Sequence, residues 1–138
     1  MNWQCTEAFV ALGSIELDQL VTFYTQLFGQ HPQPYQPKIY AEYRLPGLRL
    51  AIFVPKLDHE LEFGQSRQSR QSKLSTQSTQ SKTSSMSICL QVLDLEPVIT
   101  ELAAMNYPRG NIITASHGRE LYIYDPDGNR LIFYEPKL

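Results

Sequence analysis

The feature that most constrains this chain is a repeated order of predicted elements on either side of a polar spacer. Residues 65–85 read QSRQSRQSKLSTQSTQSKTSS, which is rich in Gln, Ser and Thr and nearly free of apolar side chains. A segment of this composition cannot bury enough apolar surface to offset the entropy lost on ordering, so we expect a mobile loop. The two flanks must therefore supply the folded core.

The first flank predicts a strand, a helix and a hairpin. Residues 8–13 form a short apolar run, and apolar side chains then recur between 17 and 28 at spacings of three and four, as on one face of a helix. Gly29 is suited to end that helix. Three prolines predict a loop over 31–37. Strands are expected at 39–45 and 48–54, joined by a turn at Pro46–Gly47.

The second flank repeats this order. A strand is expected at 86–92, followed by a helix that Asp94 caps and that the sequence at 107–110 ends. Further strands are expected near 112–113, at 119–124 and at 129–135, the last two joined by a DPDG turn. The repeated order indicates an internal duplication and an α+β fold.

Composition narrows the class of protein further. A chain of 138 residues with 42% hydrophobic content is expected to form a single domain. The net charge of −2 argues against a nucleic-acid partner. No apolar run approaches the roughly 18 residues of a membrane span, and no signal sequence is evident, so we expect a cytoplasmic protein with no membrane partner. Cys5 and Cys89 lack metal-type spacing and are interpreted as free thiols.

Three segments carry a resemblance to a known superfamily. They are VALGSIELDQLVTFYTQLFG at 10–29, ICLQVLDLEPVITEL at 88–102 and LYIYDPDGNRLIFYEP at 121–136. Together they resemble the vicinal oxygen chelate superfamily of glyoxalases, bleomycin-resistance proteins and extradiol dioxygenases. The resemblance implies two βαβββ modules that form a curved mixed sheet around a cleft. The implied organisation is one domain over 1–138, with modules at 7–56 and 86–136 and a polar linker loop at 57–85.

The resemblance also implies where a metal would bind. Metal-dependent members use His or Gln from the first strand and Glu from the last strand of each module, and these positions fall on Phe9, Ala51, Ser87 and Ile132. None of these side chains is a credible ligand for zinc, nickel or iron, so we expect no metal and no other cofactor. Glu135 is no substitute, because a residue three positions from Ile132 on a strand points to the opposite face.

The histidines offer no alternative metal site. His31, His59 and His117 all lie in predicted loops, and we interpret them as solvent-exposed side chains. Cys89 has no histidine at a motif-like spacing, and we interpret it as an inert thiol rather than a nucleophile.

Strand alternation predicts which residues line the cleft. The predicted ligand-binding residues are Phe9, Arg49, Ala51, Phe53, Ser87, Cys89, Gln91, Tyr122, Tyr124, Arg130, Ile132 and Tyr134. Aromatic walls with two arginines suit a flat or amphipathic ligand that carries an acidic group. The alternative is that both arginines are ordinary exposed strand residues.

Three functions stay open at this stage. The first is a metal-free protein that binds a small molecule and forms a homodimer, as bleomycin-resistance members do. The second is a lyase, isomerase or dioxygenase-like enzyme of the same superfamily that uses no metal or an atypical metal site. Without a metal it would need a positioned titratable pair. The third is a regulatory or interaction module whose basic spacer recruits a partner, which truncation of 65–85 would reveal. Fold resemblance alone does not choose among them.

Overall fold

The structure is a computed structural model that describes residues 2–67, 84–108 and 110–138. The chain divides into two compact units, Met1–Gln77 and Ser78–Leu138. Most of the predicted spacer, including the basic residues after position 67, lies outside the described residues.

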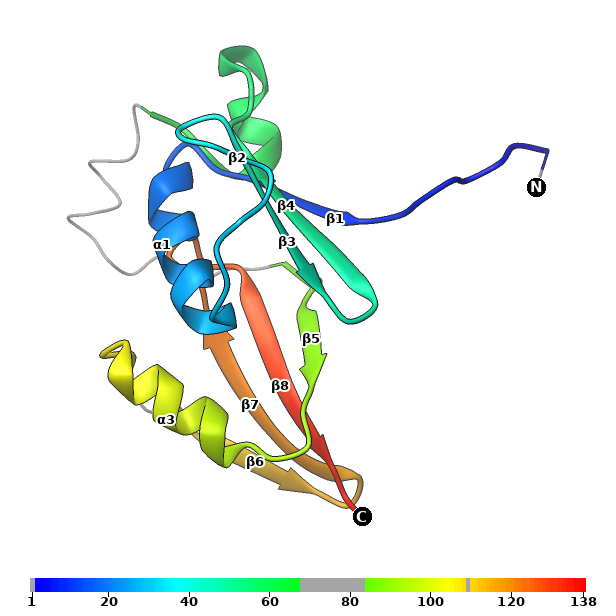
Figure 1. Ribbon diagram of the computed structural model, residues 1–138, viewed down its shortest axis with the longest axis vertical. Helices are drawn as coiled ribbons and strands as arrows, with labels where there is room; N and C mark the ends of the chain where they lie inside the picture. Colours follow the sequence, from blue (N-terminus) through cyan, green and yellow to red (C-terminus); the bar gives the residue numbers. More distant parts are fainter. Residues whose placement is uncertain (1, 68–83, 109) are drawn as a thin grey trace. The chain divides into compact units, whose positions relative to one another are not determined.

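The first unit is a four-stranded sheet with one α-helix against it (Figure 1). Its strands follow the order β1-β4-β3-β2, in which β1 runs parallel to β4 and the other pairs are antiparallel. Its elements are β1 (Val10–Gly13), α1 (Leu17–Phe28), β2 (Tyr35–Gln36), β3 (Tyr40–Leu45), β4 (Leu48–Phe53) and the 3-10 helix η1 (Leu57–Phe63).

The second unit repeats this topology. Its strands follow the order β5-β8-β7-β6, with β5 parallel to β8 and the other pairs antiparallel. Its elements are β5 (Ile88–Gln91), α3 (Glu96–Ala104), β6 (Ile112–Ala115), β7 (Gly118–Tyr124) and β8 (Arg130–Pro136). The predicted α+β fold of two βαβββ modules is therefore confirmed.

The structure differs from the prediction at two places in the first unit. The proline-rich segment contains the short strand β2, because the two residues between Pro34 and Pro37 keep their N–H groups and pair with β3. The beginning of the range predicted as a linker forms η1 instead of an irregular loop. Its Phe63 ring packs edge-on against Phe53, with ring centroids 5.1 Å apart, and this apolar contact holds η1 against the sheet.

The helix of the first unit packs closely on its sheet. Leu20 and Tyr24 of α1 are fully buried, as are Tyr43 and Ile52 of the sheet. The Tyr43 hydroxyl donates to the Val21 carbonyl oxygen at 3.1 Å, so this buried polar atom is satisfied. The helix ends at a left-handed residue (φ 63°), which is the predicted Gly29.

The helix of the second unit is held mainly at its beginning. Within α3 only Leu102 is buried, although Leu95 just before the helix is fully buried. The Glu135 carboxylate accepts the Leu95 N–H at 2.9 Å and pairs with the Arg119 guanidinium at 2.8 and 2.9 Å. The Arg119 contact, helped by the Leu95 N–H, lowers the pKa of Glu135 from 4.5 to about 2. Asp94 accepts the Glu96 N–H, as a residue at the start of a helix is expected to do.

The DPDGN turn is organised by its first carboxylate. Asp125 is buried and accepts the backbone N–H groups of Asp127 and Asn129 at 2.9 Å each. It also accepts the Asn129 side-chain amide at 2.8 Å. The turn therefore fixes the alignment of β7 against β8, and with it the rows of side chains on the sheet.

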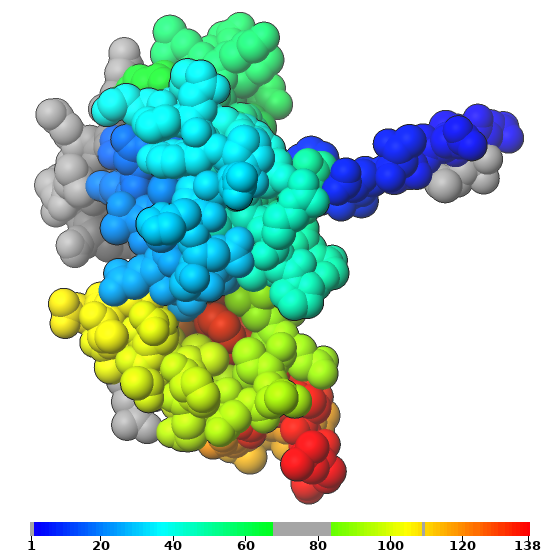
Figure 2. Space-filling view, in the orientation of Figure 1, coloured from blue at the N-terminus to red at the C-terminus, as the bar shows by residue number. Residues whose placement is uncertain are grey.

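The residues before β1 form an extended arm on the first unit. Figure 2 shows this arm in blue, projecting away from the rest of that unit. Its Trp3 side chain is exposed. Among the described residues, no helix is long and apolar enough to cross a membrane.

Candidate functional site

The face of each sheet that points away from its α-helix, here called the distal face, carries the predicted site residues. In the second unit Cys89 lies beside Ile132, which lies beside Tyr122, so the three form one row. This row alternates with the buried row of Leu131 and Ile123. The same reasoning places the other predicted strand residues on the distal faces: Arg49, Ala51 and Phe53 in the first unit, and Gln91, Tyr124, Arg130 and Tyr134 in the second.

The distal face of the second unit exposes aromatic rings. Tyr122 is 37% exposed and Tyr124 is 46% exposed, both from β7. Tyr134 of β8 lies in the row beyond Ile132 and is half-buried. Cys89 is exposed on the neighbouring strand. Because the described helix of this unit, α3, lies on the opposite face, these tyrosines are available to a flat apolar surface.

Arg130 is held in place by neutral partners. Its Nε donates to the Ser87 hydroxyl at 2.6 Å, and its Nη2 donates to the carbonyl oxygens of Ser84 and Met86 at 2.9 and 3.2 Å. Two predicted site residues, Ser87 and Arg130, thus bind each other. Within the part of the chain that the structure describes, no carboxylate pairs with Arg130, so its positive charge is uncompensated.

Arg49 in the first unit has a different environment. Its guanidinium carbon lies 3.8 Å from the centre of the Phe9 ring, and its Nε lies 3.2 Å from a carboxylate oxygen of Glu7. Its Nη1 lies 3.4 Å from a carboxylate oxygen of Glu42. The side chain is 19% exposed. Arg49 therefore stacks on one predicted site residue and is neutralised by two carboxylates.

Glu42 is a central residue of this face that the sequence reasoning missed. It is 4% exposed, accepts the Tyr40 hydroxyl at 2.8 Å and pairs with Arg44 at 3.0 Å. Burial raises the pKa of Glu42, but the Tyr40 hydrogen bond and the charges of Arg49 and Arg44 outweigh it, so the pKa is lowered. Alternation along β3 was the available signal, since Tyr40, Glu42 and Arg44 share the face opposite its apolar row.

The remaining predicted residues of the first unit are partly closed off. Ala51 lies on the distal face but is only 1% exposed, so a ligand has almost no access to it. Phe53 contacts Phe63 of η1. A side chain at Gly13 would meet the Phe63 ring at 2.7 Å, which shows how tightly η1 covers this end of the sheet.

A second missed group lies at the edge of the distal face of the second unit. His117 Nε2 lies 3.3 Å from a carboxylate oxygen of Glu120, and its ring centre lies 5.6 Å from that of Tyr134. The Tyr134 hydroxyl donates to the His117 carbonyl oxygen at 3.0 Å. His117 is exposed in the β6–β7 turn, as predicted, and its ring also lies against a predicted site residue, which the sequence reasoning did not foresee. Glu120 shares the face of Tyr122 and was detectable by the same alternation.

Known proteins resemble this chain in their structures and not detectably in their sequences. No protein-family model matches the sequence, and no curated protein matches it. Solved structures match nearly the whole chain. The lactoylglutathione lyase of Agrobacterium tumefaciens has a TM-score of 0.64 at 18% identity, over 95% of this chain and 94% of that one. This chain has the glyoxalase / bleomycin-resistance fold.

Two further structures with this fold show what it accommodates. A bleomycin-binding protein complexed with bleomycin matches with a TM-score of 0.58 at 18% identity, over 96% of this chain and all of that one. A fosfomycin resistance protein from Listeria monocytogenes, complexed with manganese(II) and a dihydroxypropylphosphonic acid, matches at 0.66 and 12% identity, over 98% and 94%. The fold thus occurs in a protein named as a binder and in one that holds a metal.

The described residues do not form a site for a metal such as the manganese(II) in the fosfomycin resistance protein. Among them, no group of three or more His, Cys, Asp or Glu side chains is arranged to hold a metal ion. Glu42 lies directly beside Ala51 in the sheet, but two guanidinium groups pair with it and would repel a cation. His117 and Glu120 supply two ligands and no third.

Proposed function

We propose that this protein binds a small aromatic or amphipathic organic molecule on the distal face of its second sheet, without a metal ion. The observation that carries the proposal is the exposure of Tyr122 and Tyr124 on the sheet face opposite α3, the helix that the structure describes in this unit. Tyrosine rings offer a large rigid contact area at low cost in side-chain entropy, which suits a flat ligand. The fold of a bleomycin-binding protein supports the same reading.

The environments of the two arginines indicate where an acidic group of the ligand would bind. Arg49 already faces the carboxylates of Glu7 and Glu42, so a third carboxylate there would meet like charge. Arg130 contacts neutral groups alone among the described residues, and it pairs directly with Tyr124 across β7 and β8. We therefore place the acidic group at Arg130 and the aromatic part of the ligand over Tyr122 and Tyr124.

The test compares matched pairs of ligands and variants. Aromatic carboxylates and their neutral amides are titrated into the protein, and binding is followed by NMR shifts of tyrosine ring signals. Tyr122→Ala should weaken both ligand classes, whereas Tyr35→Ala, which removes a similarly exposed ring (42%) from the first unit, should change neither. Arg130→Gln should weaken the carboxylates by roughly tenfold and leave the amides unchanged. Equal losses for Tyr122→Ala and Tyr35→Ala would reject the proposal. Sedimentation of the same samples tests the expected homodimer.

The His117–Glu120 pair favours a second candidate function, metal-independent proton transfer. A carboxylate oxygen 3.3 Å from Nε2 can hold the imidazole in one orientation, as a general acid–base group requires. Such a pair would exchange the proton next to a carbonyl group of a bound aryl ketone. The measurement is deuterium uptake at that carbon in heavy water, which should occur with the protein and fall in His117→Asn and Glu120→Gln. Deuterium uptake no faster than in buffer would reject proton transfer, and binding would then be the remaining proposed function.

A further inference from the structure

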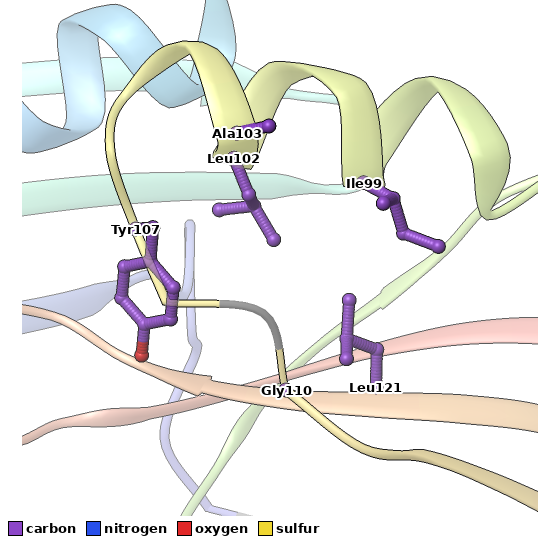
Figure 3. Close-up of a pocket in the computed structure, with 6 residues that line it drawn as sticks. All are labelled: Ile99, Leu102, Ala103, Tyr107, Gly110 and Leu121. Carbon is purple, nitrogen blue, oxygen red and sulfur yellow. The ribbon is translucent and has the colours of Figure 1, made fainter.

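The second unit contains an apolar pocket on the side of its sheet opposite to the distal face. The pocket lies between α3 and the sheet and has a volume of about 160 Å³ (Figure 3). It is lined by Ile99, Leu102, Ala103, Tyr107, Gly110 and Leu121. Leu121 belongs to the buried row of β7, so this pocket is separate from the exposed tyrosines of the same strand.

The wall of the pocket offers a ligand no charge. Its one side-chain polar atom is the Tyr107 hydroxyl oxygen, which accepts the backbone N–H of Tyr124 at 2.7 Å. Figure 3 shows this hydroxyl at the end of the ring that points away from Leu102 and Ala103. The ring face and the aliphatic side chains are left to contact an occupant. Desolvating a charged or strongly polar molecule against such a wall would be unfavourable.

Small residues keep the pocket open. Gly110 has no side chain, and a Cβ atom there would lie 3.3 Å from the Leu121 side chain and 3.4 Å from the Tyr122 carbonyl oxygen. Ala103 contributes only a methyl group from α3. The helix itself buries only Leu102, so neighbouring side chains do not fill the space.

The size of the pocket limits its occupant. The apolar side chains that line the pocket have no atoms to contact across the void. An apolar molecule that enters the pocket supplies these van der Waals contacts. An apolar cavity of roughly 150 Å³ in another protein stays dry and binds benzene. We propose that this pocket binds an uncharged hydrocarbon ring about the size of benzene. This site is distinct from the distal face, and the two can be tested separately.

The experiment titrates benzene and toluene into the full chain and follows the methyl signals of Ile99, Leu102 and Leu121 by NMR. Saturable shifts of these methyls are expected. Ala103→Leu enlarges a side chain that lines the pocket and should weaken binding at least tenfold. Ala104→Leu makes the same change at the next alanine of α3, which is exposed like Ala103 but does not line the pocket, and it should bind as the natural protein does.

Two further variants keep the outcome decisive. If Ala103→Leu does not fold, Ala103→Val places a smaller group in the pocket and should still weaken binding. Arg130→Gln, which alters the distal face, should leave hydrocarbon binding unchanged. Absence of saturable methyl shifts in the natural protein would overturn the proposal. Equal losses in the Ala103 and Ala104 variants would also overturn it.

Discussion

The two units share one topology and differ in both of the surfaces that their sheets present. On the helix side, α1 packs four buried residues onto its sheet, whereas α3 buries one and leaves a pocket. On the distal side, the first unit pairs two arginines with the carboxylates of Glu42 and Glu7, whereas the second exposes tyrosines beside Arg130, which contacts no carboxylate of the described residues.

The two units share the strand order and register that an internal duplication preserves, and they differ in side-chain packing and charge. Strand order and register depend on alternation and turns, which both halves keep. Packing density and charge depend on single side chains, which the halves do not share. The first unit therefore has the features of a stable scaffold, and the second has the open surfaces that a ligand requires.

The largest expected effect contrasts the two helices. Tyr24 is fully buried and its ring packs against Phe28 and Tyr43, so Tyr24→Ala should lower the free energy of unfolding by roughly 3–5 kcal/mol. Ile99 is only half-buried and already borders a void, so Ile99→Ala should cost about 1–2 kcal/mol. Denaturant unfolding measures both, and similar losses would remove the contrast in packing.

A smaller effect contrasts the carboxylates of the two distal faces. Glu42→Gln leaves Arg49 without its buried partner and should cost roughly 1–3 kcal/mol. Glu120→Gln removes a partly exposed carboxylate whose partner is His117, and it should cost under about 1 kcal/mol. Denaturant unfolding measures both losses of unfolding free energy. A larger loss for Glu120→Gln than for Glu42→Gln would contradict the structural role assigned to Glu42.

The smallest effect concerns pH and the anchor of α3. The pKa of Glu135 is lowered from 4.5 to about 2 by Arg119 and the Leu95 N–H, so its carboxylate is more acidic in the folded state. A lowered pKa contributes stability above the unfolded value, and this contribution is lost as pH falls from about 4.5 toward 2. The stability difference between the natural protein and Glu135→Gln should therefore shrink over that range. A difference that stays constant with pH would show that the anchor carries no ionic contribution.

The topology was predictable from the repeated order of elements in the two halves. The residues of the distal faces were predictable because successive side chains on a strand point to opposite faces. Alternation alone places Tyr122, Tyr124 and Tyr134 on one face. Glu42 and Glu120 obey the same rule, but neither lies at a position that the resemblance aligns with a metal ligand, so they were missed. The partners of Arg49 and Arg130 were not predictable, since they depend on side-chain conformation. The strand β2 was hidden by its flanking prolines.

The central claim is that this glyoxalase-fold protein recognises its ligand with side chains alone. The most direct measurement purifies the protein without chelators and determines bound metal by elemental analysis, before and after addition of nickel, zinc, iron(II) and manganese. We expect no stoichiometric bound metal, and we expect no change in thermal stability when any of these metals is added. One tightly held metal ion per chain would contradict it, and would show that the residues aligned with the metal positions have been assigned wrongly.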